Sequence, residues 1–269
     1  MHCHPVNLYT KLFFMLTGIL TGCAGNNATL PAGVLQPPEK EVPSDWQPEK
    51  LTPNHLALAR DLVHQGYYTV AMRQLTQALN EKTDDPEPHC LLGVCQRETG
   101  NLAAARNSFY RAIDLDPEYA PAYSGLGITY YLLNRDGPAR DALEKAAKLN
   151  PADADYQNNL GVLELQRNRL DSARSYFEQC LRLDPGHSRA KNNLAECLVR
   201  LGQDDTALEF LKRHFPPATA CNNLGGVYLA TGQPALARRM FRQALDHDPN
   251  LAAARRNLNR MKKREDLTP

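Results

Sequence analysis

The sequence repeats itself every 34 residues over most of its length, and three residue types keep this period independently. The recurring residues are the glycines Gly93, Gly127 and Gly161, the prolines Pro117, Pro151 and Pro185, and the alanines Ala71, Ala105, Ala139, Ala173 and Ala207. A fixed period of this length indicates one small structural unit copied along the chain. Each copy must stack on its neighbours to bury its apolar face.

The clearest copy, residues 120–153, predicts two helices joined by a turn. Small and apolar residues recur at helical spacing in both halves, first as Tyr123, Leu126, Gly127 and Tyr130 and then as Ala139, Leu143 and Ala146. Asn134 and Gly137 break the pattern between the halves. Asn150-Pro151 is expected to end the second helix, because proline cannot continue a helix. The sequence therefore predicts an all-α fold of helix–turn–helix units.

These residues resemble the tetratricopeptide repeat, whose pattern runs aromatic, Leu-Gly, Tyr, Ala, Phe and Pro over about 34 positions. The resemblance implies a right-handed α-solenoid of six repeats, with first helices that line a concave groove, and a C-terminal capping helix. The repeats are expected at 52–85, 86–119, 120–153, 154–187, 188–217 and 218–251, and the cap at 252–265. The fifth repeat has only 30 residues, so its second helix should lose about one turn.

The first segment, residues 1–22, is typical of an export signal. Its apolar run from Leu12 to Leu20 is too short to cross a bilayer, which takes about 20 residues in a helix. The run ends in Leu20-Thr21-Gly22-Cys23, which resembles the lipobox of bacterial lipoproteins. That resemblance implies cleavage before Cys23 and acylation of its thiol, for example with palmitate. Ala24 resembles the residue that follows the cysteine in lipoproteins sorted to the outer membrane, where the protein would face the periplasm.

Residues 23–51 are predicted to form a lipidated, proline-rich tether without helical periodicity. Its prolines are Pro31, Pro37, Pro38, Pro43 and Pro48. The only tryptophan, Trp46, is expected to cap the first helix pair, although a docking epitope is the alternative.

Composition and motifs argue against catalysis and against nucleic-acid binding. A net charge of +1 supplies no field to hold a polyanion. The phosphate-loop, zincin and serine-hydrolase motifs are absent, so no catalytic residue, cofactor or metal is expected. The seven cysteines have no metal-ligand spacing. Cys180 and Cys197 are expected to lie on packed helices, where they either form a disulfide or act as small buried apolar residues.

The candidate binding residues are paired asparagines in one slot of three first helices. The pairs are Asn158 and Asn159, Asn192 and Asn193, and Asn222 and Asn223. An amide offers a donor and an acceptor, as an extended peptide backbone requires. The alternative is that these amides only pack into the turn between repeats. Arg189, Glu196 and Arg200 are expected to add charge to the same surface.

The most economical interpretation is a non-enzymatic, lipid-anchored scaffold of the bacterial cell envelope that binds a protein or peptide in its groove. Its architecture resembles that of pilotin and TadD-type proteins of pilus secretion systems, which implies assistance in pilus or secretin assembly. One alternative is an adaptor for cell-wall hydrolases or proteases. Another, an enzyme part that presents substrate, would need a further domain, because the repeats already account for the residues after the tether.

Overall fold

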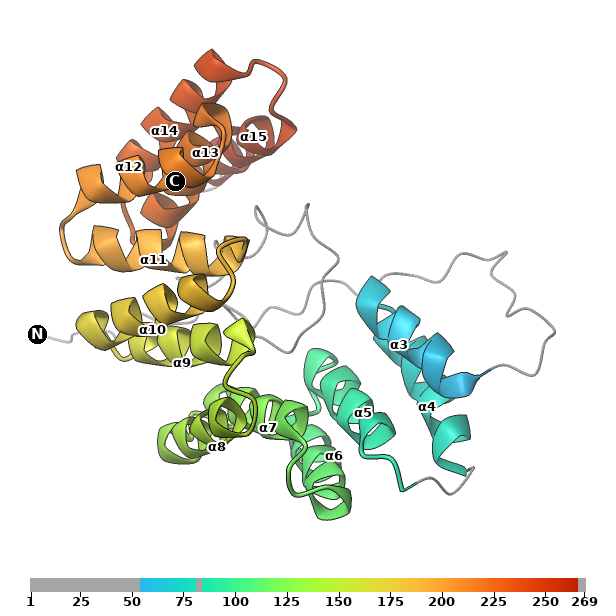
Figure 1. Cartoon of the computed structure of the whole chain (residues 1–269). Helices are drawn as coiled ribbons and strands as arrows, with labels where there is room; N and C mark the ends of the chain where they lie inside the picture. Colours follow the sequence, from blue (N-terminus) through green and yellow to red (C-terminus); the bar gives the residue numbers. More distant parts are fainter. Residues whose placement is uncertain (1–53, 81–83, 266–269) are drawn as a thin grey trace, which may run out of the picture. The chain divides into compact units, whose positions relative to one another are not determined.

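The computed structural model of the protein describes residues 54–80 and 84–265. Over these residues the chain forms thirteen α-helices and no strand, and the helices follow one another as hairpins (Figure 1). The all-α fold predicted from the sequence is therefore confirmed. The predicted signal segment, the lipidation site Cys23 and the tether with Trp46 lie outside the described residues.

Each predicted repeat contains a first and a second helix. The first helices are α3 (His55–Gln65), α5 (Glu87–Glu98), α7 (Ala120–Leu132), α9 (Ala154–Gln166), α11 (Ser188–Arg200) and α13 (Pro217–Ala230). The second helices are α4 (Tyr68–Asn80), α6 (Leu102–Leu115), α8 (Asp136–Leu149), α10 (Leu170–Leu183), α12 (Asp204–His214) and α14 (Pro234–His247), and α15 (Ala252–Glu265) follows them. At 11 residues, α12 is three residues shorter than α10, close to the one turn expected from the short fifth repeat.

The helices form two compact units, and the boundary falls inside α9, between Leu163 and Glu164. In the first unit, α3 to α8 pack in chain order, and α5 also contacts the first helices on either side of it. In the second unit, α10 to α15 pack in the same order, and α11 contacts α13. The second helices α12 and α14 are thus each held between their own first helix and the next helix along the chain.

Small residues set how closely the helices approach. The five alanines that keep the 34-residue period are all fully buried. A Cβ atom on Gly127 would lie 2.7 Å from Leu143 Cγ and 3.0 Å from the Ala139 carbonyl oxygen, so only glycine fits between α7 and α8. Gly93 and Gly125 likewise make room for the fully buried ring of Phe109. The periodic glycines and alanines are therefore packing residues.

One local prediction was wrong. Gly137 was expected in the turn of the third repeat, but it lies in the first turn of α8. Asn134, the other predicted break, does lie in the turn, where its backbone adopts the left-handed conformation with φ 57°.

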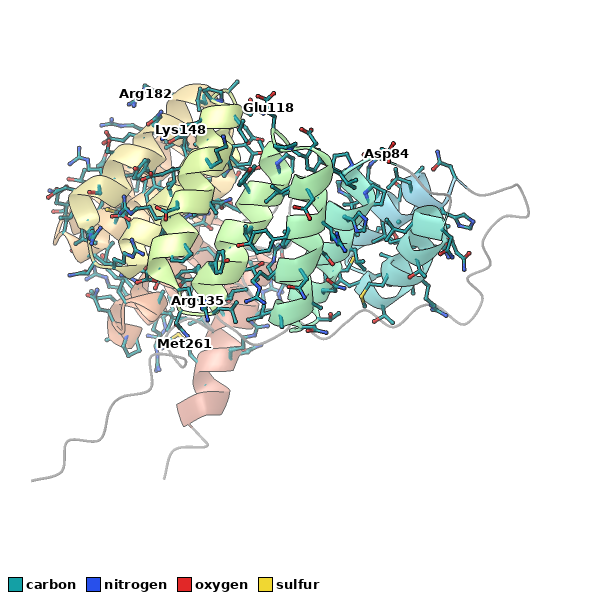
Figure 2. All side chains as sticks on the ribbon, turned by 90° about the horizontal axis from the view of Figure 1, so that it is seen from below. Asp84, Glu118, Arg135, Lys148, Arg182 and Met261 are labelled. Carbon is teal, nitrogen blue, oxygen red and sulfur yellow. The ribbon has the colours of Figure 1, made fainter. Side chains whose placement is uncertain are left out.

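Charged side chains cover the outside of the helices. Asp84, Glu118, Arg135 and Lys148 are exposed, whereas Met261 of α15 is buried (Figure 2). Among the described residues, no helix combines the length and the apolar character needed to span a bilayer.

Candidate functional site

The predicted binding residues lie on three first helices, and in each unit we call the surface that carries them the first-helix face of that unit. In the first unit α9 contributes Asn158 and Asn159, and in the second unit α11 and α13 contribute Arg189, Asn192, Asn193, Glu196, Arg200, Asn222 and Asn223. The asparagines differ in burial. Asn193 and Asn223 are half-buried, while the other four amides are buried.

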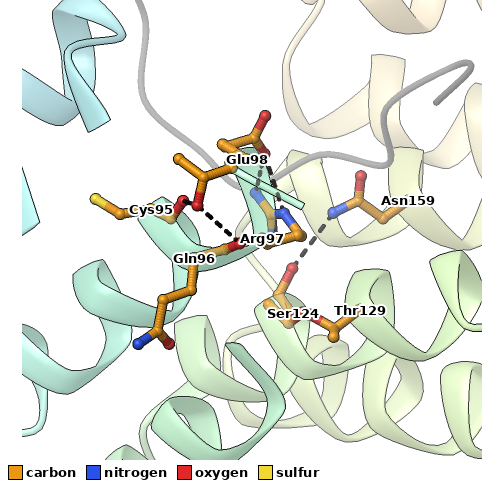
Figure 3. A network of polar contacts seen from close by, with 9 residues as sticks. Cys95, Gln96, Arg97, Glu98, Ser124, Thr129 and Asn159 are labelled. Carbon is orange, nitrogen blue, oxygen red and sulfur yellow. Dashed lines mark hydrogen bonds and ion pairs between the residues drawn. The ribbon is translucent and has the colours of Figure 1, made fainter. Parts of the chain in front are cut away.

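In the first unit, one amide of the first-helix face connects neighbouring first helices. Asn159 Nδ2 donates a hydrogen bond of 3.3 Å to Ser124 Oγ on α7, and both side chains are buried (Figure 3). Asn159 therefore acts in stacking one repeat on the next. This is the packing use of the amides that the sequence left as an alternative.

The second unit repeats the same connection. Asn257 Nδ2 on α15 donates a hydrogen bond of 3.0 Å to Asn222 Oδ1 on α13. Ser124 and Asn257 were not among the predicted site residues, although the period contains the signal for both. Ser124 lies 34 residues before Asn158, and Asn257 lies 34 residues after Asn223.

The centre of the first-helix face on α11 is a buried ion pair. Asn192, Glu196 and Arg200 recur every four residues and so share one side of the helix. Glu196 Oε1 lies 2.5 Å from Arg200 Nη2, and Arg200 Nη1 donates a hydrogen bond of 3.1 Å to the Leu165 carbonyl oxygen. Glu196 was expected to add surface charge, but its side chain is only 1% exposed. This burial raises the pKa of the Glu196 carboxyl, although Arg200 acts in the opposite direction.

Two acceptor atoms beside this ion pair lack a hydrogen-bond donor. They are Asn192 Oδ1 and Glu196 Oε2, which accept no hydrogen bond from the described residues, whereas Glu196 Oε1 is paired with Arg200 Nη2. A buried acceptor without a donor costs free energy. The α11 side of the first-helix face is thus suited to groups that donate N–H bonds.

The same helix carries several cationic side chains. Besides Arg200, α11 carries Arg189, which is half-buried, and Lys191, which is buried. The Lys191 ammonium lies 5.5 Å from the centre of the Phe215 ring, in a cation–π contact. Because Glu196 is the only acidic residue on α11, this helix is positively charged.

The described thiols are not arranged for chemistry. Cys180 and Cys197 are both buried, and they do not form the disulfide that the sequence left open. Cys197 Sγ donates a hydrogen bond of 3.1 Å to the Leu170 carbonyl oxygen, and burial raises the pKa of this thiol to about 11. Within the described ranges there is no cluster of three or more His, Cys, Asp or Glu side chains that could hold a metal ion.

Solved structures with the same fold include three bacterial proteins. A tetratricopeptide repeat protein of Parabacteroides merdae is 19% identical, with a TM-score of 0.56 over 76% of this chain and 82% of its own. The pilF protein of Pseudomonas aeruginosa is 18% identical, with a TM-score of 0.56 over 77% of this chain and 96% of its own. TTC0263 of Thermus thermophilus, also a tetratricopeptide repeat protein, is 21% identical, with a TM-score of 0.51 over 76% of this chain and 95% of its own. At these identities the likeness concerns the fold.

The sequence itself matches profiles of one family. Three profiles, each described as tetratricopeptide repeat, match residues 97–161 and 164–224, residues 138–188, and residues 218–251. These matches run without a gap from residue 97 to residue 251, which is more than half of the chain. The protein therefore belongs to the tetratricopeptide repeat family, whose fold is that of a protein–protein interaction scaffold.

Proposed function

We propose that the protein is a non-catalytic scaffold that binds an extended peptide segment of a protein partner on the first-helix face of the second unit. The observation that carries this proposal is the pair of buried acceptors on α11, namely Asn192 Oδ1 and Glu196 Oε2. The backbone N–H groups of an extended peptide are donors that could satisfy them without regard to side-chain identity. The half-buried amides of Asn193 and Asn223 supply further donors and acceptors on the same unit.

The binding claim is tested with a triple variant, Asn192→Ala, Asn193→Ala and Asn223→Ala. Asn159 is left intact because its hydrogen bond to Ser124 joins two repeats, so its loss would mix stability with binding. A photo-crosslinking amino acid at position 193 first captures the partner from the envelope, and the affinity of that partner is then measured. We expect the triple variant to bind about tenfold more weakly, with unchanged helical content.

The matched control is Asn107→Ala, which removes an exposed amide from the second helix α6. It should bind the partner like the unaltered protein. Equal affinity of the triple variant and the control would exclude the first-helix face as the binding site.

The proposed setting is the bacterial cell envelope. We infer that residues 1–22 direct export and that Cys23 is lipidated and holds the protein at the outer membrane, facing the periplasm. Cys23→Ser should leave the chain uncleaved and without lipid. Mature-sized Cys23→Ser protein retained normally in the membrane would contradict the lipid anchor.

Within that setting, we propose that the scaffold assists the assembly of a pilus or its secretin. The support is the combination of a lipobox, a chain of this length and six repeats, which resembles the architecture of pilotin and TadD-type proteins. Co-purification from a detergent-solubilised envelope should recover secretin or pilus subunits. Recovery of murein hydrolases or proteases in their place would overturn this assignment and favour the adaptor role.

A further inference from the structure

A second candidate docking site lies between two second helices of the second unit. A cavity of about 440 Å³ opens between α10 and α12, above α11. Its floor is apolar and consists of Leu181, Leu194, Leu198 and Phe210. We call this cavity the α10–α12 groove. Its size and apolar floor suit one or two bulky side chains of a ligand.

The groove exists because the residues that close the equivalent place in the third repeat are missing. There, Tyr110 of α6 and Tyr130 of α7 meet with their hydroxyl oxygens 2.6 Å apart. Two repeats later, the same slots hold Glu178 and Leu198, which leave the space between the helices unfilled. Tyrosine returns at the slot of Leu198 in the sixth repeat, as Tyr228.

The short fifth repeat contributes to the opening. Helix α12 ends at His214, because Pro216 and Pro217 follow and start the next first helix. Compared with α10 and α14, α12 therefore lacks three residues that could cover the floor.

The rim of the groove is charged. Arg174 and Glu178 form an ion pair, with Nε and Oε1 2.8 Å apart, and so satisfy one another. Arg182 and Arg213 are exposed and form no ion pair with any described residue, and Arg182 points outward (Figure 2). Glu209 is the one acidic rim residue left without a partner among the described side chains. Partial burial and the nearby cations Lys191 and Arg213 lower the pKa of the His214 ring. With three arginines against two glutamates, the rim is positive.

The groove and the first-helix face use opposite sides of α11. Leu194 and Leu198 each follow two residues after Asn192 and Glu196, and two residues along a helix correspond to about 200° of rotation. A partner in the groove therefore leaves the polar side of α11 uncovered.

We propose that the α10–α12 groove is a docking site for a protein segment that inserts a bulky apolar side chain and carries carboxylates beside it. The buried leucines provide the pocket for the apolar anchor. Arg182 and Arg213 provide the charge that selects acidic flanks. This inference does not depend on peptide binding at the first-helix face.

The test uses the full chain and a fluorescein-labelled octapeptide, Gly-Asp-Glu-Leu-Phe-Asp-Glu-Gly amide, in a fluorescence anisotropy titration. One control peptide has Lys in place of every acidic residue, and the other has Gly in place of Leu-Phe. We expect the acidic apolar probe to bind at least about tenfold more tightly than either control. Equal binding of the three peptides would overturn the proposal.

Two variants locate the binding. Leu198→Tyr fills the groove with the residue that the third and sixth repeats use, and it should weaken probe binding about tenfold while circular dichroism confirms the fold. Arg182→Glu combined with Arg213→Glu changes only exposed positions, and it should weaken binding of the acidic probe and strengthen binding of the lysine peptide. Undiminished probe binding by the folded variants would contradict the assignment.

Two further variants serve as controls. Arg135→Glu reverses an exposed charge in the other unit and should leave probe affinity unchanged. The Asn192→Ala, Asn193→Ala, Asn223→Ala variant should also bind the probe normally. If it does not, the probe binds on the first-helix face and the groove proposal fails, whatever the outcome for the partner captured there.

Discussion

The third and fifth repeats show two outcomes of the same helical hairpin. In the third repeat, Gly127 allows α7 to lie directly against α8, whose Leu143 fills the space beside it. In the fifth repeat, the same slot holds Ala195, α12 has 11 residues in place of the 14 of α8, and α11 and α12 contact each other less extensively.

The two repeats also differ at their outer junctions. Tyr110 and Tyr130 close the junction before the third repeat, whereas Glu178 and Leu198 leave the junction before the fifth repeat open. The difference shows how a repeat protein gains a docking groove at little cost. Relative to the third repeat, the fifth has two different residues at its outer junction and four fewer residues in all, and its junction has an apolar floor with a charged rim.

The two regions should differ most in the free energy of unfolding that is lost when Phe109 or Phe210 is replaced by alanine. Phe109 is fully buried between α5, α6 and α7, so Phe109→Ala should lower the free energy of unfolding by about 3–5 kcal/mol. Phe210 is only half-buried at the groove, so Phe210→Ala should cost about 1 kcal/mol. Urea unfolding followed by circular dichroism measures both. Similar losses would mean that the α10–α12 groove is packed as tightly as the earlier junction.

Substitutions of the small residue in the glycine slot test the same difference in helix packing between the third and fifth repeats. Gly127→Ala places a methyl group against Leu143 and the Ala139 carbonyl, and it should destabilise the protein by about 1–3 kcal/mol despite its higher helix propensity. Ala195→Gly should cost about 1 kcal/mol, chiefly through backbone entropy. A stabilising Gly127→Ala would show that the third hairpin is looser than its geometry indicates.

The helical hairpins could be predicted from the sequence because the period fixes the residues that meet between helices. Small residues such as Ala139 and helix-ending pairs such as Asn150-Pro151 act locally, within one copy of the unit. The break was placed correctly at Asn134, whose backbone is left-handed, and wrongly at Gly137, which the first turn of α8 includes.

The candidate site could be predicted only in part. The asparagine pairs indicated a polar face. Ser124 was missed because a search for identical residues does not find it, since its slot holds asparagine in other repeats, yet it accepts a hydrogen bond from Asn159. The burial of Glu196 was missed because it depends on the helices around α11. The groove was missed for a similar reason, since Leu198 opens it only in combination with a residue on another helix, Glu178.

A smaller effect is expected from opening the closed junction. Tyr130→Leu gives the third repeat the residue of the fifth and removes the contact between the Tyr110 and Tyr130 hydroxyls, so it should cost about 1–2 kcal/mol. Tyr130→Phe, which keeps the ring, isolates the hydroxyl and should cost about 1 kcal/mol or less. Thermal and urea unfolding measure both. A Tyr130→Leu variant as stable as the parent would show that the tyrosine pair does not close the junction.

The smallest expected effect concerns Glu196 and depends on pH. Burial raises the pKa of this carboxyl above its ordinary value of 4.5, so between that value and the raised pKa the folded state binds more protons than the unfolded state. Stability must then fall as the pH rises through this window. At pH 7, burial of the charge should therefore make Glu196→Gln more stable than the parent, and the difference should shrink as the pH falls toward 4.5. A Glu196→Gln variant that is less stable at pH 7 would mean that attraction to Arg200 outweighs the burial cost, and that the acceptors on α11 are satisfied without a partner.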